Sequence, residues 1–302
     1  FLSPQWMAAW RDVDQTAAAQ HFEVVVNCGT GCPFGGPEVT IDEPACKAVF
    51  VDSMITSDKR PSDQHRLAVP AKERPYAQWQ CTRVYPTSQP RQWRVISVYA
   101  SRTRQKVKRA APGGEGLVID HFDRQAVAHY LNRFTQAFEY TKTPYPHTFF
   151  NDSYEVYKAN WTPSLFDEFL KRRGYDLRDH LPELLDGGDG NKALHDYRET
   201  LSDLLYENFT QQWVAWAHRN GVSVRNQAHG SPANLLDLYA SVDIPEIEGF
   251  GRSEFGIRGL RRDPGMTLKN YSDVSMLKYA SSAAHVMGKP LTSSETLNWL
   301  TE

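Results

Sequence analysis

Hydrophobic positions along the chain switch between helical spacing and short β-type runs. A first helix is expected near the start, because Ser3-Pro4 places a capping residue before a proline at the first helical position. Its apolar side chains then fall on one stripe, formed by Trp6, Trp10, Val13 and Ala17. Helical spacing returns in four later segments, around residues 127–138, 162–174, 194–220 and 274–287.

Short β-rich runs separate these helices, and polar residues close each run. In chain order the closing residues are Asn27, Asp120, Asn151 with Asp152, Asn226, Glu248 and Glu295, after runs at 22–26, 117–119, 148–150, 222–225, 244–247 and 291–294. One such residue often only marks the start of a loop. Six in order favour a (β/α)8 barrel, because the C-terminal strand ends of that fold form its active face.

The sequence therefore predicts an α/β fold, a (β/α)8 barrel that is incomplete and holds strands two to seven. Residues 1–37 are expected to start the barrel, and residues 117–302 to continue it to a point before strand eight. Residues 38–116 are too long for an ordinary βα connection and contain strand-like runs at 78–85 and 93–99. We expect them to form a β-rich insertion between strands two and three.

Composition narrows the choice of partners. With 36 acidic and 34 basic residues the net charge is -2, whereas a nucleic-acid partner favours a basic surface. No apolar run approaches the roughly 18 residues that a membrane span needs. The chain begins at Phe1, so we expect it to be part of a longer protein. The cysteines match no zinc spacing and are interpreted as thiols, with a Cys28–Cys32 disulfide left open.

One segment is strongly basic against this balance. Its cations are Arg102, Arg104, Lys106, Lys108 and Arg109. The segment is interpreted as a solvated loop, and the alternative is a surface that binds anions or pectin.

Long motifs follow one another from residue 120 onward. They include "DHFDRQAVAHYLNRF" from Asp120, "FFNDSYEV" from Phe149, "RNQAHGSPANLLDLY" from Arg225, "DIPEIEGFG" from Asp243 and "PLTSSETLNWLTE" from Pro290. In this order they resemble the bacterial α-L-rhamnosidases of glycoside hydrolase family 106, over about residues 117–302.

The resemblance implies a (β/α)8 catalytic domain that removes terminal α-L-rhamnose from plant glycans or glycosides, with inversion at the anomeric carbon. It also implies a Ca²⁺ ion near the sugar hydroxyls, whose ligands it does not identify. The partner is then a rhamnose-containing oligosaccharide or glycoside, and this substrate class suggests a periplasmic or secreted enzyme. The truncated barrel alone is expected to be inactive.

Two glutamates are the candidates for the catalytic pair. Glycoside hydrolysis needs one carboxyl group that protonates the leaving oxygen and a second that activates water or attacks directly. Glu155 in "NDSYE" and Glu295 in "SSET" lie just past expected strand ends and within matching motifs. We therefore expect Glu155 to be the general acid and Glu295 the general base, with Glu248 as the alternative acid.

Further residues are candidates for contacts with the sugar. Glu246 and Glu248 lie on one side of their strand, where they can bind Ca²⁺, bind hydroxyls, or pair with Arg252 or Arg258. Asp120 and Asp152 are expected to contact sugar or metal. The residues expected to bind hydroxyls or stack on the sugar are Asn27, Asn226, His229 and Trp299, of which Trp299 can equally be a buried helix anchor.

Two other functions compete with this hypothesis. A metal-dependent barrel lyase or isomerase, with Asp120, Asp152 and Glu248 as ligands, would need a lysine or histidine base at a strand end, and no lysine follows an expected strand. A carbohydrate-binding protein on a non-catalytic barrel would have lost one catalytic carboxylate. Since Glu155 and Glu295 are both present, catalysis is favoured.

Overall fold

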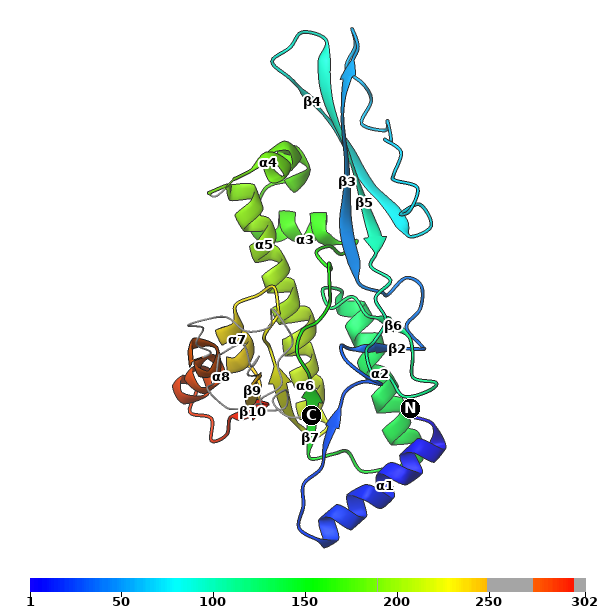
Figure 1. The fold of residues 1–302 in the computed structure, drawn as a ribbon, viewed down its shortest axis with the longest axis vertical. Helices are drawn as coiled ribbons and strands as arrows, with labels where there is room; N and C mark the ends of the chain where they lie inside the picture. The colour runs from blue at the N-terminus through cyan, green and yellow to red at the C-terminus, as the bar shows by residue number, and fades with distance from the viewer. Residues whose placement is uncertain (189, 249–273, 296–302) are drawn as a thin grey trace, which may run out of the picture.

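A five-stranded parallel sheet lies at the centre of the fold. The computed structural model describes residues 1–188, 190–248 and 274–295 (Figure 1). The sheet order is β1 (Val25–Asn27), β7 (Thr148–Asn151), β8 (Ser223–Gln227), β9 (Ile244–Glu248) and β10 (Ser293–Glu295). All four neighbouring pairs are parallel, so the carboxyl ends of the five strands meet at one edge.

The expected (β/α)8 barrel is wrong. The described residues form no complete barrel, and the strand order is not that of a barrel fragment. The run at 117–119 does not join the parallel sheet, because β6 (Leu117–Val118) pairs antiparallel with β2 (Gly35–Gly36). A side chain on Gly35 would meet the carbonyl oxygen of Leu117 at 2.3 Å, so only glycine permits this close pairing.

Helices precede and connect the strands. They are α1 (Pro4–Ala19), α2 (Arg124–Thr141), α3 (Leu165–Arg173), the 3₁₀ helix η1 (Leu177–His180), α4 (Leu181–Asp186), α5 (Lys192–Leu204), the π-helix η2 (Leu205–Gln211), α6 (Gln212–Arg219), α7 (Leu235–Ala240) and α8 (Val274–Val286). The helix expected at the start is confirmed, with the side chain of Ser3 accepting from Trp6 N at 3.2 Å. The long helix expected at 194–220 is α5, η2 and α6 in direct succession.

Aromatic packing fixes α2 and α6 against the sheet. The apolar stripe of α2 is buried, and the Phe134 ring meets Phe149 of β7 edge-on at 6.0 Å. Trp216 of α6 stacks on the same Phe149 ring at 5.1 Å. Because Phe149 is fully buried, its truncation to alanine is expected to cost roughly 3–5 kcal/mol of unfolding free energy. The aromatic core therefore sets the position of β7 and of the loop that follows it.

A separate antiparallel sheet extends away from the parallel one as a long blade (Figure 1). It consists of β3 (Cys46–Thr56), β4 (Ala77–Pro86) and β5 (Gln92–Arg102), with β5 in the middle. The strands expected at 78–85 and 93–99 are thus confirmed as parts of β4 and β5. The four cysteines, including Cys28 and Cys32, are free thiols. No helix in the described part is both long and apolar enough to cross a membrane.

Candidate active site

Polar side chains line the carboxyl edge of the parallel sheet. Register places Glu295 beside Glu248, and Gln227 beside Glu246. Asn151 lies beside Asn226 and donates from Nδ2 to Oδ1 of Asn226 at 2.7 Å. Strand pairing therefore brings together residues from β7, β8, β9 and β10 that are far apart in the sequence.

Asp152 lies among three other carboxylates. Burial is the main cause that raises its pKa, and the negative charges of Glu295, Glu248 and Glu155 raise it further. The Ser153 N–H opposes them by donating to Asp152 at 2.7 Å. The negative charges of three glutamates thus act on Asp152, an arrangement typical of functional sites.

Glu155 is held at the rim of this carboxylate cluster from two sides. Its Oε2 lies 2.7 Å from Nζ of Lys108, and its Oε1 accepts from the hydroxyl of Tyr157 at 2.9 Å. Gln105 donates to the Glu155 backbone carbonyl at 2.6 Å. With a third of its side chain exposed, Glu155 is fixed yet reachable from solvent.

Glu295 is bound by a buried amide. Nε2 of Gln227 donates to Oε2 of Glu295 at 2.7 Å and to Oε1 of Glu246 at 2.8 Å. Glu246 also pairs with Arg225, whose Nε lies 3.1 Å from Oε2. This gives Glu246 a structural ion pair within the sheet. Its expected partners Arg252 and Arg258 lie outside the described residues, as does Trp299.

Two further candidates, His229 and Glu248, contact each other. Nε2 of His229 lies 3.0 Å from Oε2 of Glu248, and both residues are buried. The backbone carbonyl of His229 accepts from Tyr154 N at 3.1 Å, which ties the loop after β8 to the loop after β7. His229 therefore orients Glu248 in this structure.

Asn27 and Asp120 lie apart from the hydrogen bonds described above. Asn27 ends β1 opposite Phe150, at the far edge of the sheet from Glu295. Asp120 follows β6 and is buried, and its Oδ1 accepts from Phe122 N at 2.9 Å. Burial raises the pKa of Asp120 to about 7. Its place away from the parallel strands follows from the pairing of β6 with β2.

Sequence reasoning missed three residues that hold the acids: Gln227, Lys108 and Tyr157. Gln227 ends a strand, and that position was a usable signal. Lys108 was visible only as part of a basic run, and no local pattern links it to Glu155. Tyr157 lies two residues after Glu155, a spacing that carries no signal outside regular structure.

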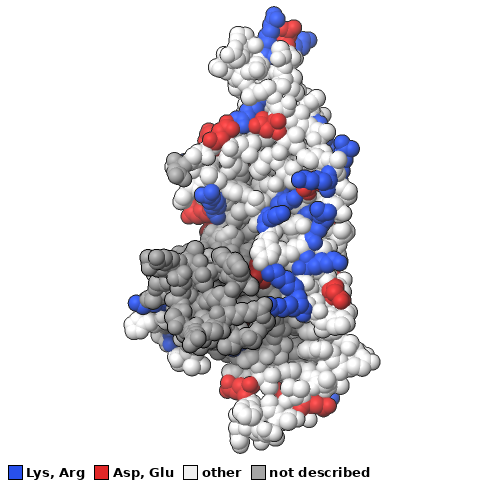
Figure 2. Space-filling model, viewed as in Figure 1, with Lys and Arg blue, Asp and Glu red and all other residues white. Residues whose placement is uncertain are grey.

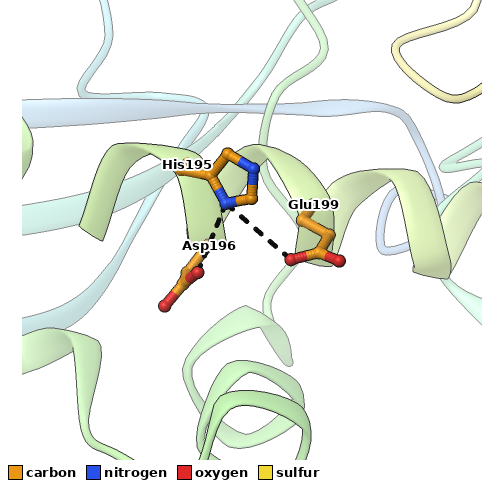
Figure 3. A group of neighbouring side chains, drawn as sticks. All are labelled: His195, Asp196 and Glu199. Carbon is orange, nitrogen blue, oxygen red and sulfur yellow. Dashed lines mark hydrogen bonds and ion pairs between the residues drawn. The ribbon is translucent and has the colours of Figure 1, made fainter. Parts of the chain in front are cut away.

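A second titratable cluster lies on α5. It consists of His195, Asp196 and Glu199 (Figure 3). Each of these side chains offers an atom that could bind a metal, and the three atoms lie within 4.8 Å of one another. Asp196 already accepts from Tyr175 at 2.8 Å and pairs with Lys192. Because Lys192 already balances the charge of Asp196, the cluster carries no argument for a metal.

Comparisons with known proteins relate the chain to glycoside hydrolases. The sequence model of glycoside hydrolase family 106, described as alpha-L-rhamnosidase, matches residues 78–301. A protein from Formosa agariphila with a provisional beta-glucuronidase name is 28% identical over 214 residues, which are 68% of this chain and 17% of that protein. The structure of a rhamnosidase from Novosphingobium sp. PP1Y matches with a TM-score of 0.55 and 27% identity, over 70% of this chain and 20% of that one. The chain thus spans 17% to 20% of the length of these relatives.

Proposed function

Because the chain belongs to glycoside hydrolase family 106, the alpha-L-rhamnosidases, we propose that it carries the active site of an enzyme that removes terminal α-L-rhamnose from plant glycans or glycosides. The observation that carries this proposal is the group of acids around Asp152, which follow β7 or end β9 and β10. Hydrolysis of a glycosidic bond requires two carboxyl groups on opposite sides of that bond. Glu155 and Glu295 come from different elements and are held by different partners, which suits such a division of roles.

In this proposal Glu155 donates a proton to the glycosidic oxygen as the bond to rhamnose breaks. Its exposure at the rim suits contact with the leaving group, and Lys108 and Tyr157 fix its orientation. Glu295 removes a proton from the attacking water, while the amide of Gln227 holds the Oε2 atom of Glu295 in place. Glu248, the alternative acid, is buried against His229 and is better suited to orienting the sugar.

We further propose inversion at the anomeric carbon, as the family resemblance implies. An inverting pair lies roughly 6.5–9.5 Å apart and leaves room for water, whereas a retaining pair lies about 5–5.5 Å apart. Asp152, Asn226 and His229 then line the region that the rhamnose hydroxyls enter, and Asn27 and Trp299 are proposed further contacts.

Calcium is proposed as an aid to sugar binding. Ca²⁺ prefers several oxygen ligands, and the crowded acids at Asp152 offer that chemistry together with a negative charge that a cation relieves. Asp152 and Glu248 would hold the ion, whereas Glu246 fits poorly because the guanidinium of Arg225 already neutralises it. When bound, Ca²⁺ supplies a positive charge that orients sugar hydroxyls. Because plant glycans are extracellular polymers, we propose a periplasmic or secreted location.

Release of nitrophenol from an aryl α-L-rhamnoside by the full-length protein tests the proposed function. The native protein is expected to turn over. Glu155→Gln is expected to lose most activity on a rhamnose-capped oligosaccharide and less on the nitrophenyl rhamnoside, because nitrophenolate leaves with little help from an acid. Glu23→Gln, an exposed glutamate on the loop before β1, is the matched control. Binding of rhamnosides without any turnover would contradict the proposal and favour a carbohydrate-binding protein.

A further inference from the structure

A row of cations leads from the antiparallel blade to Glu155. The basic strip, defined as Arg104, Lys106, Lys108 and Arg109, follows directly after β5. Figure 2 shows Lys and Arg side chains gathered along this side of the molecule, where basic groups outnumber acidic ones. The chain as a whole is slightly acidic, with a net charge of -2, so the strip is a local feature.

The backbone of the basic strip is held from both sides. Lys106 forms an antiparallel bridge with Leu117, and Lys108 forms one with Cys32. Lys108 N donates to the Cys32 carbonyl at 2.7 Å. Alternation along this extended segment places Lys106 and Lys108 on one face, with their Cα atoms roughly 6.6 Å apart. Val107, which lies between them, is buried. The cations are therefore presented by a fixed backbone.

The strip has more positive charge than its neighbours neutralise. Lys108 pairs with Glu155, and Arg104 lies over the Tyr76 ring at 4.4 Å. Lys106 and Arg109 are exposed and form no ion pair within residues 1–188, 190–248 and 274–295. Two cations that flank Lys108, the partner of Glu155, along the chain thus remain available to a ligand.

The thiol of Cys32 shows how near the strip lies to the acids. Burial raises the pKa of Cys32, Asp152 and Glu155 raise it further, and Lys108 and Arg109 lower it. Sγ of Cys32 lies 4.0 Å from Oε2 of Glu155. The acids and the strip are therefore within electrostatic reach of the same atom.

We propose that the basic strip binds anionic groups, carboxylates or sulfate esters, on the part of the glycan that leaves with the glycosidic oxygen. This inference rests on the proposed function, in which Glu155 protonates that oxygen. Cations beside Glu155 then face the leaving group, not the rhamnose. The preferred substrate is an acidic glycan capped by rhamnose, and its attraction to the strip weakens as salt screens the charges.

The test compares the full-length native protein with the double variant Lys106→Ala, Arg109→Ala, which leaves Lys108 in place. The substrates are a neutral aryl α-L-rhamnoside, a rhamnose-capped oligosaccharide containing uronate, its carboxyl-reduced form, and a sulfated analogue. The matched control is Arg219→Ala with Lys278→Ala, two exposed cations on α6 and α8. Both kcat/KM and the Kd of the uronate oligosaccharide are measured at low and high salt.

The native protein is expected to prefer the uronate substrate to its reduced form, and the double variant to lose at least about fivefold in kcat/KM on the acidic substrate alone. A loss confined to the sulfated analogue would identify sulfate as the group bound. Native kcat/KM that is no higher on either acidic substrate, uronate or sulfated, than on the reduced form, or a double variant that matches the native protein on both acidic substrates, would overturn the inference. If the native protein does not cleave rhamnosides, the proposed function fails, and the Kd alone decides whether the strip binds the anion.

Discussion

Nε2 of Gln227 lies 2.7 Å from Oε2 of Glu295, although β9 separates their two strands in the sheet. The same nitrogen reaches Glu246 on the intervening strand. One fully buried amide thus links β8, β9 and β10 at the edge where the acids gather. Glu295 owes its orientation in part to a residue on another strand.

Gln227→Met keeps the side-chain volume and removes both hydrogen bonds. Since a hydrogen bond to a charged group contributes roughly 1.5–3 kcal/mol, we expect kcat to fall about 10- to 100-fold with little change in KM. Steady-state kinetics and the pH profile of kcat measure the effect. Gln78→Met, at an exposed position on β4, is the matched control. Native kinetics in a folded Gln227→Met protein would remove Gln227 from the positioning of Glu295.

Glu295→Gln is expected to lower kcat at least about 100-fold, because an amide keeps the shape of the side chain but cannot accept a proton. Binding of the rhamnoside, measured by calorimetry, should persist. A variant that retains turnover would show that another group is the base.

The stereochemical course is expected to be inversion. Cleavage of an α-L-rhamnoside should first yield β-L-rhamnose, which NMR detects before the anomers equilibrate. Appearance of the α-anomer first, or a glycosyl ester trapped on Glu295, would instead make Glu295 a nucleophile.

Exhaustive chelation is expected to reduce activity, and added Ca²⁺ to restore it, if the ion orients the sugar hydroxyls. The effect should appear mainly in KM, because the ion acts on binding. Magnesium serves as the control cation, since its smaller, stricter coordination shell suits this role poorly. Full activity after chelation would remove the metal from the mechanism.

Asp120→Asn is expected to change how stability depends on pH. Burial raises the pKa of Asp120 to about 7 from an ordinary value of 3.8, so folding takes up a proton between those pH values. The contribution of Asp120 to stability is therefore fully present below about pH 4 and is lost as pH rises to 7. The variant keeps the acceptor for Phe122 N and does not titrate.

Relative to the native protein, this variant should gain up to roughly 1.4 kcal/mol of unfolding free energy per pH unit within that window. Denaturant unfolding of the full-length protein at pH 5 and pH 8 measures the difference. Burial lowers the pKa of neighbouring His121 to about 4, which gives an opposite slope, but this slope occurs in both proteins and cancels. An equal difference at both pH values would contradict the prediction.

The hydrophobic pattern of the sequence predicted where most of the parallel sheet lies along the chain. The runs at 22–26, 148–150, 222–225, 244–247 and 291–294 all overlap strands of that sheet, because short apolar runs with polar ends are typical of buried parallel strands. The run at 117–119 has the same pattern and a different partner. Pairing depends on contacts distant in sequence, here with Gly35 and Gly36, which the run itself does not encode.

The candidate site was likewise predictable where it depends on local pattern and not where it depends on distant contacts. Strand ends gave Glu248 and Glu295 directly, because position along a strand is a local property. The partner of Glu155 was not predictable, since Lys108 reaches it from a segment beyond β5. Whether an acid is ion-paired depends on tertiary placement, and periodicity carries no information about it.

The order of strands in the parallel sheet has a consequence for biosynthesis. A ribosome releases Glu155 well before Glu295, and β9 has no partner on its β10 side until β10 emerges. During that interval Gln227 and Glu246 lack the third member of their contact, and one edge of the sheet is open to other chains. A nascent chain paused within this interval therefore lacks Glu295 and is prone to association, so chaperone binding should concentrate on chains stalled between β9 and β10.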